Sequence, residues 1–395
     1  MADGVTAARG FLASGVHCGI RKSRPDLALV VSEREASAAA VFTTNRVQAA
    51  PVVVSREHLA LSGGKARAIV VNSGNANACT GDDGLRAARE TAVEAGRRLE
   101  IPSEQVLVAS TGVIGVPLPI SSLLSGLPAA AEALSPTGGA AAAAAILTTD
   151  TRMKLAETSV MTRRGRYVVG GMAKGSGMIH PNLATTLAFV TTDAGLPPDP
   201  LRRCLARAAE LSFNRISVDG DTSTNDMVAV LAGGASGIEV HEGTLPLFEA
   251  ALTEVLVDLA KQVAGDGEGA TKLITVEVSG AESDADALQV ARTVAGSPLV
   301  KTAVHGADAN WGRVVAAAGR SGVAIVPERM TVAFDQVEVL NPGFLSNFSE
   351  EAARCALDKK EVSIRVDLGL GTGSAVTWTC DLTSGYVEIN ASYRT

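Results

Sequence analysis

Apolar residues along the chain follow two spacings, one typical of helices and one typical of strands. In 82–100, Leu85, Ala88, Ala92 and Leu99 share one face at helical spacing, with Asp82 or Asp83 near the start. The same spacing recurs in 244–264, at Phe248, Leu252, Val255, Leu259 and Val263. Both stripes predict amphipathic helices packed on a core.

Short β-branched or alternating runs predict strands from end to end of the chain. They include 68–71, 106–109 and a hairpin around Met161 and Val168, whose turn is Arg-Arg-Gly. The last third adds the segments ITVEVSG, MTVAFDQVEVL, EVSIRVDLGLGTG, SAVTWTCDLT and GYVEINASY. Because strands and helices mix without a regular β-α-β alternation, the expected fold class is α+β or a layered α/β sandwich.

Composition narrows the classes of function. The 395 residues are 46% hydrophobic, which is enough for one large domain or two ordinary ones. Aromatic residues make up only 3% and the net charge is −7, so we expect no nucleic-acid partner. The first residues lack the layout of a secretory signal and no apolar run approaches a membrane span, so we expect a cytoplasmic protein without membrane contact.

The five cysteines are odd in number, far apart and without C-x-x-C pairs. This distribution argues against a disulfide framework and against a Cys-based zinc site, and it favours buried free thiols. The five histidines lack the spacings of zinc-binding motifs, so no metal is expected. There is no G-x-S-x-G elbow for a serine nucleophile, and neither GMAKGSG nor DGEGATK has the spacing of a phosphate-binding loop.

Three segments combine glycine with polar residues: VNSGNANACTG at 71–81, STGVIG at 110–115 and DGDTSTND at 219–226. Such clusters form either turns or a backbone arranged around a ligand, and the residues alone leave both interpretations open. STGVIG follows the strand expected at 106–109. It would therefore present the backbone N–H groups of Thr111 and Gly112 at a strand end, as an oxyanion hole requires.

The segment KGSGMIHPNLATTL offers a nucleophile that needs no histidine. A threonine hydroxyl can be activated by the α-amine of the same residue, once that residue becomes a chain start. Thr185 would attack the carbonyl of Ala184, an N-to-O acyl shift would form an ester, and water would release the upstream piece. The alternative is that Thr185 and Thr186 simply begin the strand TTLAFVTT.

This segment resembles the signature of the ornithine acetyltransferase family, the glutamate N-acetyltransferases of arginine biosynthesis. VNSGNANACTG, VLVASTGVIG, ILTTDT, DGDTSTND, DGEGATK, SPLVKTAVHGADANWGR and NASYRT resemble further family blocks, in the family's order. The resemblance implies self-cleavage between Ala184 and Thr185. It would give an α chain of 1–184 and a β chain of 185–395, with Thr185 as the N-terminal nucleophile and Thr111 and Gly112 as the oxyanion hole.

By the same resemblance, the enzyme would transfer acetyl from N2-acetylornithine to glutamate in a ping-pong cycle. The implied substrate contacts are Thr148, Lys174, Thr185, Glu268, Asn390 and Thr395. Lys174 would suit a substrate carboxylate and Glu268 a substrate ammonium. No cofactor is implied, although acetyl-CoA is a second donor in bifunctional members, and the family suggests that two α and two β chains assemble.

Two positions depart from the family pattern. A second threonine, Thr186, follows the first and could shift the cut by one residue. Ala309 replaces a common proline, and we expect this change to affect only the local loop. We expect nearby His305 to have a structural role and not a catalytic one.

Two other functions stay open from the sequence. One is an N-terminal-nucleophile amidase or aminopeptidase, in which water deacylates Thr185. The other is an unprocessed amino-acid binding protein.

Overall fold

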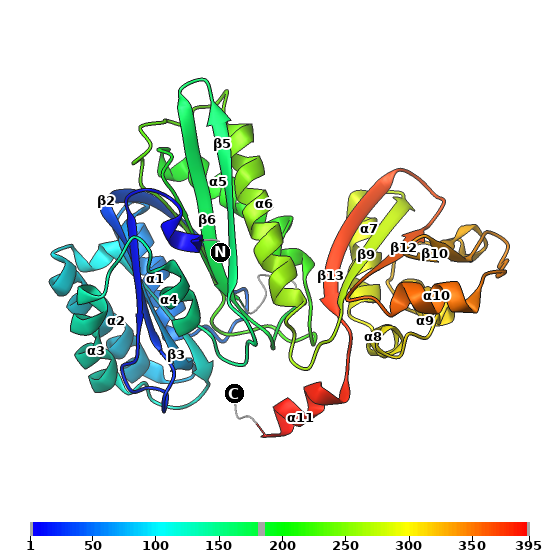
Figure 1. The fold of residues 1–395 in the computed structure, drawn as a ribbon, viewed down its shortest axis with the longest axis horizontal. Helices are drawn as coiled ribbons and strands as arrows, with labels where there is room; N and C mark the ends of the chain where they lie inside the picture. Colours follow the sequence, from blue (N-terminus) through cyan, green and yellow to red (C-terminus); the bar gives the residue numbers. More distant parts are fainter. Residues whose placement is uncertain (1–2, 181–185, 393–395) are drawn as a thin grey trace.

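The computed structural model describes residues 3–180 and 186–392, which form a large module and a small module (Figure 1). The large module holds an eight-stranded mixed sheet with the order β4-β3-β2-β8-β7-β6-β5, in which β1 pairs with β2. Its strands are β1 Phe11–Val16, β2 Leu27–Phe42, β3 Lys65–Asn75, β4 Val106–Val113, β5 Lys154–Thr162, β6 Gly165–Lys174, β7 Leu187–Thr192 and β8 Met227–Ala232. Its helices are α1 Ala50–Leu61, α2 Gly81–Leu99, α3 Ile120–Glu132, α4 Gly139–Ala145, α5 Pro198–Glu210 and α6 Leu245–Ala264, with 3-10 turns at Gly4–Thr6, Ser103–Gln105 and Phe213–Arg215.

The long strand β2 divides this sheet into two halves. Its first part pairs with β1 and β3, its last part pairs with β8, and the register to β3 shifts between Val31 and Ala36. Side chains from both halves, such as Val30 and Phe189, meet in one core cluster. Helices α1 to α3 cover the outer face of one half, and α5 and α6 cover the other. The layers therefore run helix, sheet, sheet, helix, which confirms the expected layered α+β fold.

The small module is built on a five-stranded sheet with the order β11-β10-β12-β9-β13. Its strands are β9 Leu273–Ala281, β10 Thr331–Phe334, β11 Val337–Leu340, β12 Glu361–Asp367 and β13 Gly373–Cys380. Its helices are α7 Asp284–Ala295, α8 Pro298–His305, α9 Trp311–Gly319 and α10 Glu350–Leu357, with a 3-10 turn at Pro327–Arg329. A separate apolar cluster forms its core, so the division between the modules falls near residue 272.

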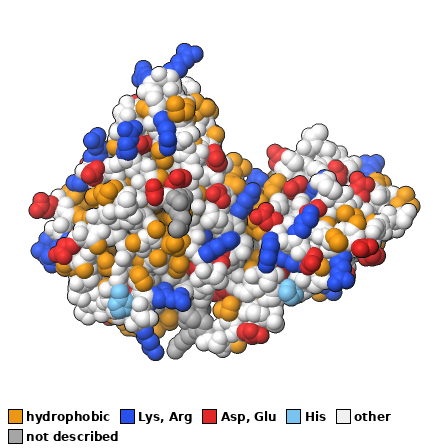
Figure 2. All heavy atoms as spheres, viewed as in Figure 1, with side chains coloured by type: hydrophobic (Ala, Val, Ile, Leu, Met, Phe, Trp, Pro, Cys, Tyr) orange, Lys and Arg blue, Asp and Glu red, His pale blue; other side chains and the backbone are white. Residues whose placement is uncertain are grey.

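The two modules are joined by specific contacts. Trp378 of β13 forms a bridge with Ile216 and lies under the Lys261 ammonium of α6, 5.2 Å from the ring centre. The buried Lys301 of α8 donates a hydrogen bond to the carbonyl of Val218. Basic side chains are visible where the modules meet on the face shown in Figure 2. These contacts hold the small module against the end of the large one.

The expectation of a strand in GYVEINASY is wrong, because the structure has a helix, α11 Ser384–Ser392, at this position. The Thr383 hydroxyl accepts a hydrogen bond from the Gly385 N–H, which turns the chain after β13, and no strand of the described residues pairs with the segment. The alternating pattern was misleading because Val387 is 65% exposed and packs on no sheet. Helix α11 runs from the small module back toward the large one (Figure 1).

The remaining expectations concern the two helical stripes, the cysteines and membrane contact. Helices α2 and α6 occupy the expected ranges, and the hairpin of β5 and β6 turns at Arg163 and Arg164. All five cysteines are free, as expected, but Cys79 and Cys355 are exposed and not buried. Within the described part of the chain, no helix is long and apolar enough to cross a membrane.

Candidate active site

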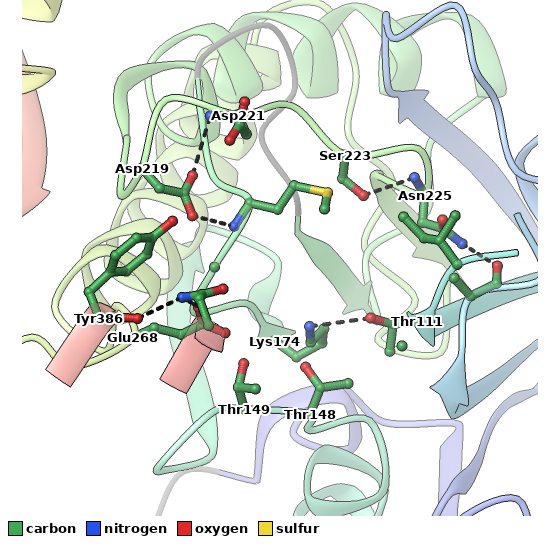
Figure 3. A pocket seen from close by; sticks show the side chains of 16 residues that line it. Thr111, Thr148, Thr149, Lys174, Asp219, Asp221, Ser223, Asn225, Glu268 and Tyr386 are labelled. Carbon is green, nitrogen blue, oxygen red and sulfur yellow. Dashed lines mark hydrogen bonds between the residues drawn. The ribbon is translucent and has the colours of Figure 1, made fainter. Parts of the chain in front are cut away.

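A cavity of about 220 Å³ lies where the large sheet, the 219–226 loop and α11 meet. Figure 3 shows Thr111 and Asn225 on one side, Glu268, Asp219 and Tyr386 on the opposite side, and Lys174 between them. The lining residues come from both modules and from distant parts of the sequence: Ala76, Thr111, Gly112, Ile114, Thr148, Thr149, Lys174, Gly177, Met178, Asp219, Asp221, Ser223, Asn225, Glu268, Tyr386 and Asn390.

The Thr111–Gly112 pair lies in the last part of β4 and not beyond its end, because β4 continues to Val113. Gly112 has a φ of +134°, which other residues rarely adopt, and a Cβ there would collide with the backbone of Gly74 on β3. Only glycine therefore fits, and β3 can approach β4 closely. The buried Thr111 hydroxyl accepts a hydrogen bond of 3.3 Å from the Lys174 ammonium.

A chain of buried charges lies behind Lys174. The Asp150 carboxylate is 3.9 Å from the Lys174 Nζ, and it accepts a 2.6 Å hydrogen bond from the fully buried Lys154. Lys154 also donates to Asp266 over 2.6 Å. Burial alone would raise the pKa of Asp150, but the charges of Lys174 and Lys154 outweigh it and hold that pKa well below its usual range. Burial lowers the pKa of Lys174, and Asp150 opposes this shift only in part.

Glu268 forms the acidic wall of the cavity, just after α6. It is 7% exposed, and its Oε2 accepts a 2.8 Å hydrogen bond from the Asn390 side chain of α11. Gly177 faces this carboxylate so closely that a Cβ would lie 2.5 Å from Oε2. Because Glu268 and Lys174 carry opposite charges across a small cavity, the site suits a ligand with both an ammonium and a carboxylate group.

Tyr386 and Asp219 complete this wall. The Asp219 carboxylate accepts backbone hydrogen bonds from Met178 and Ile179 at 2.6 and 2.9 Å, which fix the chain just after the Lys174 loop. Burial raises the pKa of Asp219 and these backbone donors oppose it, while burial and the nearby acids raise the pKa of Tyr386 to about 12. Both residues also line a second cavity, which contains His305.

The structure brings together most of the site residues that the sequence indicated. Thr111, Gly112, Thr148, Lys174, Glu268 and Asn390 all line the same cavity. Ala184, Thr185 and Thr395 lie outside the described residues. His305 pairs with Asp381 over 3.0 Å and is absent from this cavity. Among the described residues, no group of His, Cys, Asp and Glu side chains is arranged to hold a metal ion.

Sequence reasoning missed Asp226, the final residue of the DGDTSTND cluster. It is 2% exposed, it directly precedes β8, and burial raises its pKa well above the usual value. The Thr186 N–H and the Thr43 and Ser223 hydroxyls oppose this shift, yet neither carboxyl oxygen makes a hydrogen bond of acceptable geometry within the described residues. The cluster was visible in the sequence, but the burial of one of its acids was not.

The layered fold thus encloses one cavity that joins a Thr-Gly pair, a buried lysine and an acid, an arrangement that suits an enzyme acting on a small charged substrate. The sequence profile of the ArgJ family matches residues 12–395, and the chain belongs to this family. Family membership confirms the resemblance that the sequence motifs indicated, and with it the expectation of an acyltransferase.

Relatives match along nearly the whole chain. The arginine biosynthesis bifunctional protein ArgJ of Chlorobaculum tepidum is 49% identical over 394 residues, which cover 99% of this chain and 97% of that protein. The protein of the same name from Symbiobacterium thermophilum is 51% identical, over 100% of this chain and 99% of that protein. The crystal structure of the arginine biosynthesis bifunctional protein argJ from Bacillus halodurans is similar to 52% of this chain and 98% of that chain, with 47% identity and a TM-score of 0.51.

Proposed function

We propose that the chain transfers acetyl from N2-acetylornithine to glutamate in arginine biosynthesis, through an acetyl ester of Thr185. The observation that carries this proposal is the convergence of Thr111, Gly112, Lys174 and Glu268 on one small cavity. Thr185 lies two residues before Leu187, the first residue of β7, and Lys174 on β6 pairs with Leu187. The proposed nucleophile is therefore tethered to a strand whose start lies beside the cavity.

The chemistry begins with self-cleavage between Ala184 and Thr185. The freed α-amine has a pKa of about 7.7–8.0 in model compounds, so a substantial fraction is neutral near neutral pH and can take the hydroxyl proton. The hydroxyl then attacks the acetyl carbonyl of the donor, the oxyanion is stabilised by the Thr111–Gly112 pair, and ornithine leaves. Glutamate receives the acetyl group from the ester in the second half of the cycle.

Substrate recognition follows from the charges of the cavity. Lys174 binds the carboxylate of the amino-acid substrate, Glu268 binds the ammonium of the ornithine side chain, and Thr148 and Asn390 add polar contacts. Thr395 contributes a further contact, as the resemblance implies. The pieces 1–184 and 185–395 stay associated because β6 and β7, on either side of the cut, are neighbouring strands of one sheet. Two copies of each piece form the assembly, and acetyl-CoA serves as a second donor.

Mass spectrometry of the purified protein tests the cleavage. We expect two pieces in place of one 40.3 kDa chain, with a new terminus at Thr185. Thr185→Ala should abolish both cleavage and transfer, whereas Thr185→Ser should retain part of each. An intact wild-type chain after long incubation, or equal activity in the Ala variant, would contradict the proposal.

Product analysis tests the acceptor. Acetylornithine supplied with glutamate should give N-acetylglutamate and ornithine, and omission of glutamate should stop turnover after the first acylation. Continued release of free acetate without glutamate would instead indicate an amidase. The same assay with acetyl-CoA in place of acetylornithine tests the second donor.

A further inference from the structure

Side chains provide the hydrogen bonds of the backbone carbonyls on the outer edge of β4. This strand lies at the end of the strand order, so alternate backbone groups face away from β3. The Val106 carbonyl accepts a 2.8 Å hydrogen bond from the ring of His58 on α1. The Val108 carbonyl accepts a 2.7 Å hydrogen bond from Ser55, also on α1. The next carbonyl in this row is that of Ser110, which directly precedes the Thr-Gly pair of the cavity.

The Ser110 carbonyl is bound by Asn225, from the loop that precedes β8. The Asn225 Nδ2 group donates a 2.8 Å hydrogen bond to this carbonyl and a 2.6 Å hydrogen bond to the carbonyl of Ala76, just after β3. Asn225 is 7% exposed, and it lines the candidate active site together with Thr111. One buried side chain therefore connects the ends of β3 and β4 beside the cavity.

The ends of β3 and β4 are paired irregularly at this point. The register of β3 to β4 shifts between Gly74 and Asn75. Gly112, which lies opposite Gly74, has the φ of +134° that only glycine tolerates well. A regular parallel ladder fixes both strands by evenly spaced hydrogen bonds, whereas a disrupted ladder fixes them less well. The two hydrogen bonds of Asn225 add the missing restraint one residue before Thr111.

Asn225 is itself held in place from two sides. Its Oδ1 accepts a 2.6 Å hydrogen bond from the Thr224 hydroxyl, and its backbone N–H donates a 3.0 Å hydrogen bond to the Ser223 hydroxyl (Figure 3). The loop backbone is bound to the segment after β2, because the Ala49 N–H donates to the Thr224 carbonyl over 2.9 Å. The Thr43 hydroxyl likewise donates to the Ser223 carbonyl over 2.7 Å. The side-chain amide is therefore oriented with its nitrogen toward the two strand ends.

We propose that Asn225 is the positioning residue of the oxyanion hole. The inference deepens the proposed function and rests on it. The Ser110 carbonyl belongs to the planar peptide unit that leads into Thr111, so a hydrogen bond to this carbonyl fixes the plane from which Thr111 continues. Asn225 thereby sets the position of Thr111 and Gly112 before the substrate arrives, as stabilisation of a developing oxyanion requires. It acts through this pair and has no chemical step of its own.

The test measures the first acyl transfer of the cleaved enzyme without glutamate, in which each active molecule releases one ornithine from acetylornithine. In Asn225→Ala, the rate constant of this release should fall by about tenfold to a hundredfold, because a small displacement of the oxyanion donors weakens transition-state binding. The acetylornithine concentration that gives half of the maximum rate should change little, since the oxyanion is absent from the bound substrate. The total ornithine released per cleaved chain should equal that of the wild type.

The total ornithine released separates positioning from a merely structural role. If Asn225 only stabilised the fold, fewer Asn225→Ala molecules would react, and those that did would react at the wild-type rate. That result, or an unchanged rate constant in all molecules, would overturn this inference alone. A wild type that is not cleaved would overturn the proposed function as well.

Asn45→Ala is the matched control. Asn45 is half-buried and donates a 3.1 Å hydrogen bond to the Thr222 carbonyl, in the same loop as Asn225. Its loss loosens the loop but leaves the hydrogen bond to the Ser110 carbonyl in place, so this variant should react at the wild-type rate. Equal slowing in Asn45→Ala and Asn225→Ala would show that the order of the loop sets the rate, and it would overturn the inference.

Thr224→Val covers the case in which Asn225→Ala fails to fold or to cleave. It keeps Asn225 and the shape of residue 224, and it removes the hydroxyl that holds the Asn225 Oδ1. The rate constant of ornithine release should fall by about fivefold, as expected for the loss of one orienting hydrogen bond, with the same total of ornithine per cleaved chain. A wild-type rate constant in Thr224→Val would count against the positioning role and overturn it.

Discussion

The Lys174 ammonium donates a hydrogen bond to the Thr111 hydroxyl over 3.3 Å, and this contact fixes the role of that hydroxyl. An ammonium has no acceptor, so the Thr111 oxygen must accept, and its own proton is free to point into the cavity. Lys174 thereby orients Thr111 as a donor. A positive charge next to the hydroxyl also strengthens it as a donor to an oxyanion.

Thr111→Val should lower kcat for acetyl transfer by about 10²-fold, because one donor to the oxyanion is lost while the shape of the side chain is kept. KM should change much less, since the oxyanion exists only in the transition state. Steady-state kinetics with acetylornithine and glutamate measure both values. Thr158→Val, in the partly exposed second half of β5, serves as the control, and an unchanged kcat in Thr111→Val would show that the Thr111 hydroxyl is not a donor to the oxyanion, which would leave that role to the backbone N–H groups.

Lys154→Met should lower the free energy of unfolding by about 3–5 kcal/mol, because two buried carboxylates, Asp150 and Asp266, lose their shared cation. Urea denaturation measures the loss. The ion pair of the exposed Arg86 with the exposed Asp83 gives the control, since Arg86→Met removes a surface ion pair worth at most about 1 kcal/mol. Equal stability of the two variants would contradict the assigned role of Lys154.

The same network predicts a loss of stability in acid. The pKa of Asp150 is lower in the folded protein than in the unfolded chain, where it is about 3.9. Its contribution to stability is therefore fully present above pH ~4 and is lost as pH falls through the folded-state pKa. Urea midpoints measured from pH 6 to pH 3 should fall more steeply in the wild type than in Asp150→Asn. Parallel curves would show that Asp150 is not linked to folding in this way.

Much of the fold was predictable because local periodicity marks helices and strands independently of their partners. The helix stripe of α6 and the hairpin of β5 and β6 were found in this way. The order of the strands was not predictable, since it depends on pairings between distant segments such as β2 and β8. The strand predicted for the α11 segment was wrong because alternating residues form a strand only where a neighbouring strand is available to pair.

The candidate site was predictable to the extent that its residues lie in recognisable motifs. Thr111, Lys174 and Glu268 lie in such motifs, and the structure places them around one cavity. Lys154 lies in an ordinary strand, and nothing in the sequence shows that it is fully buried between two acids. The sequence likewise does not show that Asp226 is almost fully buried in the fold.

Glu268→Gln should raise KM for acetylornithine by about tenfold or more, because the substrate ammonium loses a desolvated, charge-assisted partner. The fall in kcat should be smaller. Asn390→Ala is the comparison variant, because it keeps the charge of Glu268 and removes only neutral hydrogen bonds: those from Asn390 to Glu268 and to the Tyr386 carbonyl, and its proposed contact with the substrate. A smaller rise in KM is therefore expected. Unchanged affinity for acetylornithine after charge reversal, Glu268→Lys, would rule out this role.

Thiol reagents should distinguish the cysteines of the folded protein. Cys79 and Cys355 are exposed and should react rapidly, whereas burial raises the pKa of Cys204 and Cys380 to about 11 and suppresses the reactive thiolate. Titration of the native protein with a colorimetric disulfide reagent should give a fast phase from these two exposed thiols. Cys79→Ser and Cys355→Ser should each remove half of it, and rapid reaction of Cys204 would contradict the packing of α5.

Thr186→Val should leave the cut at Thr185 and should not lower the thermal stability. Within the described residues the buried Thr186 hydroxyl has no hydrogen-bond partner, so its replacement by a methyl group of similar size removes an uncompensated polar atom and leaves no cavity. Terminal sequencing of the cleaved wild type should find one new terminus, at Thr185, and Thr186→Val should give the corresponding piece at the same rate. A second terminus at Thr186 in the wild type that disappears in Thr186→Val would show instead that both hydroxyls compete for the carbonyl that precedes them.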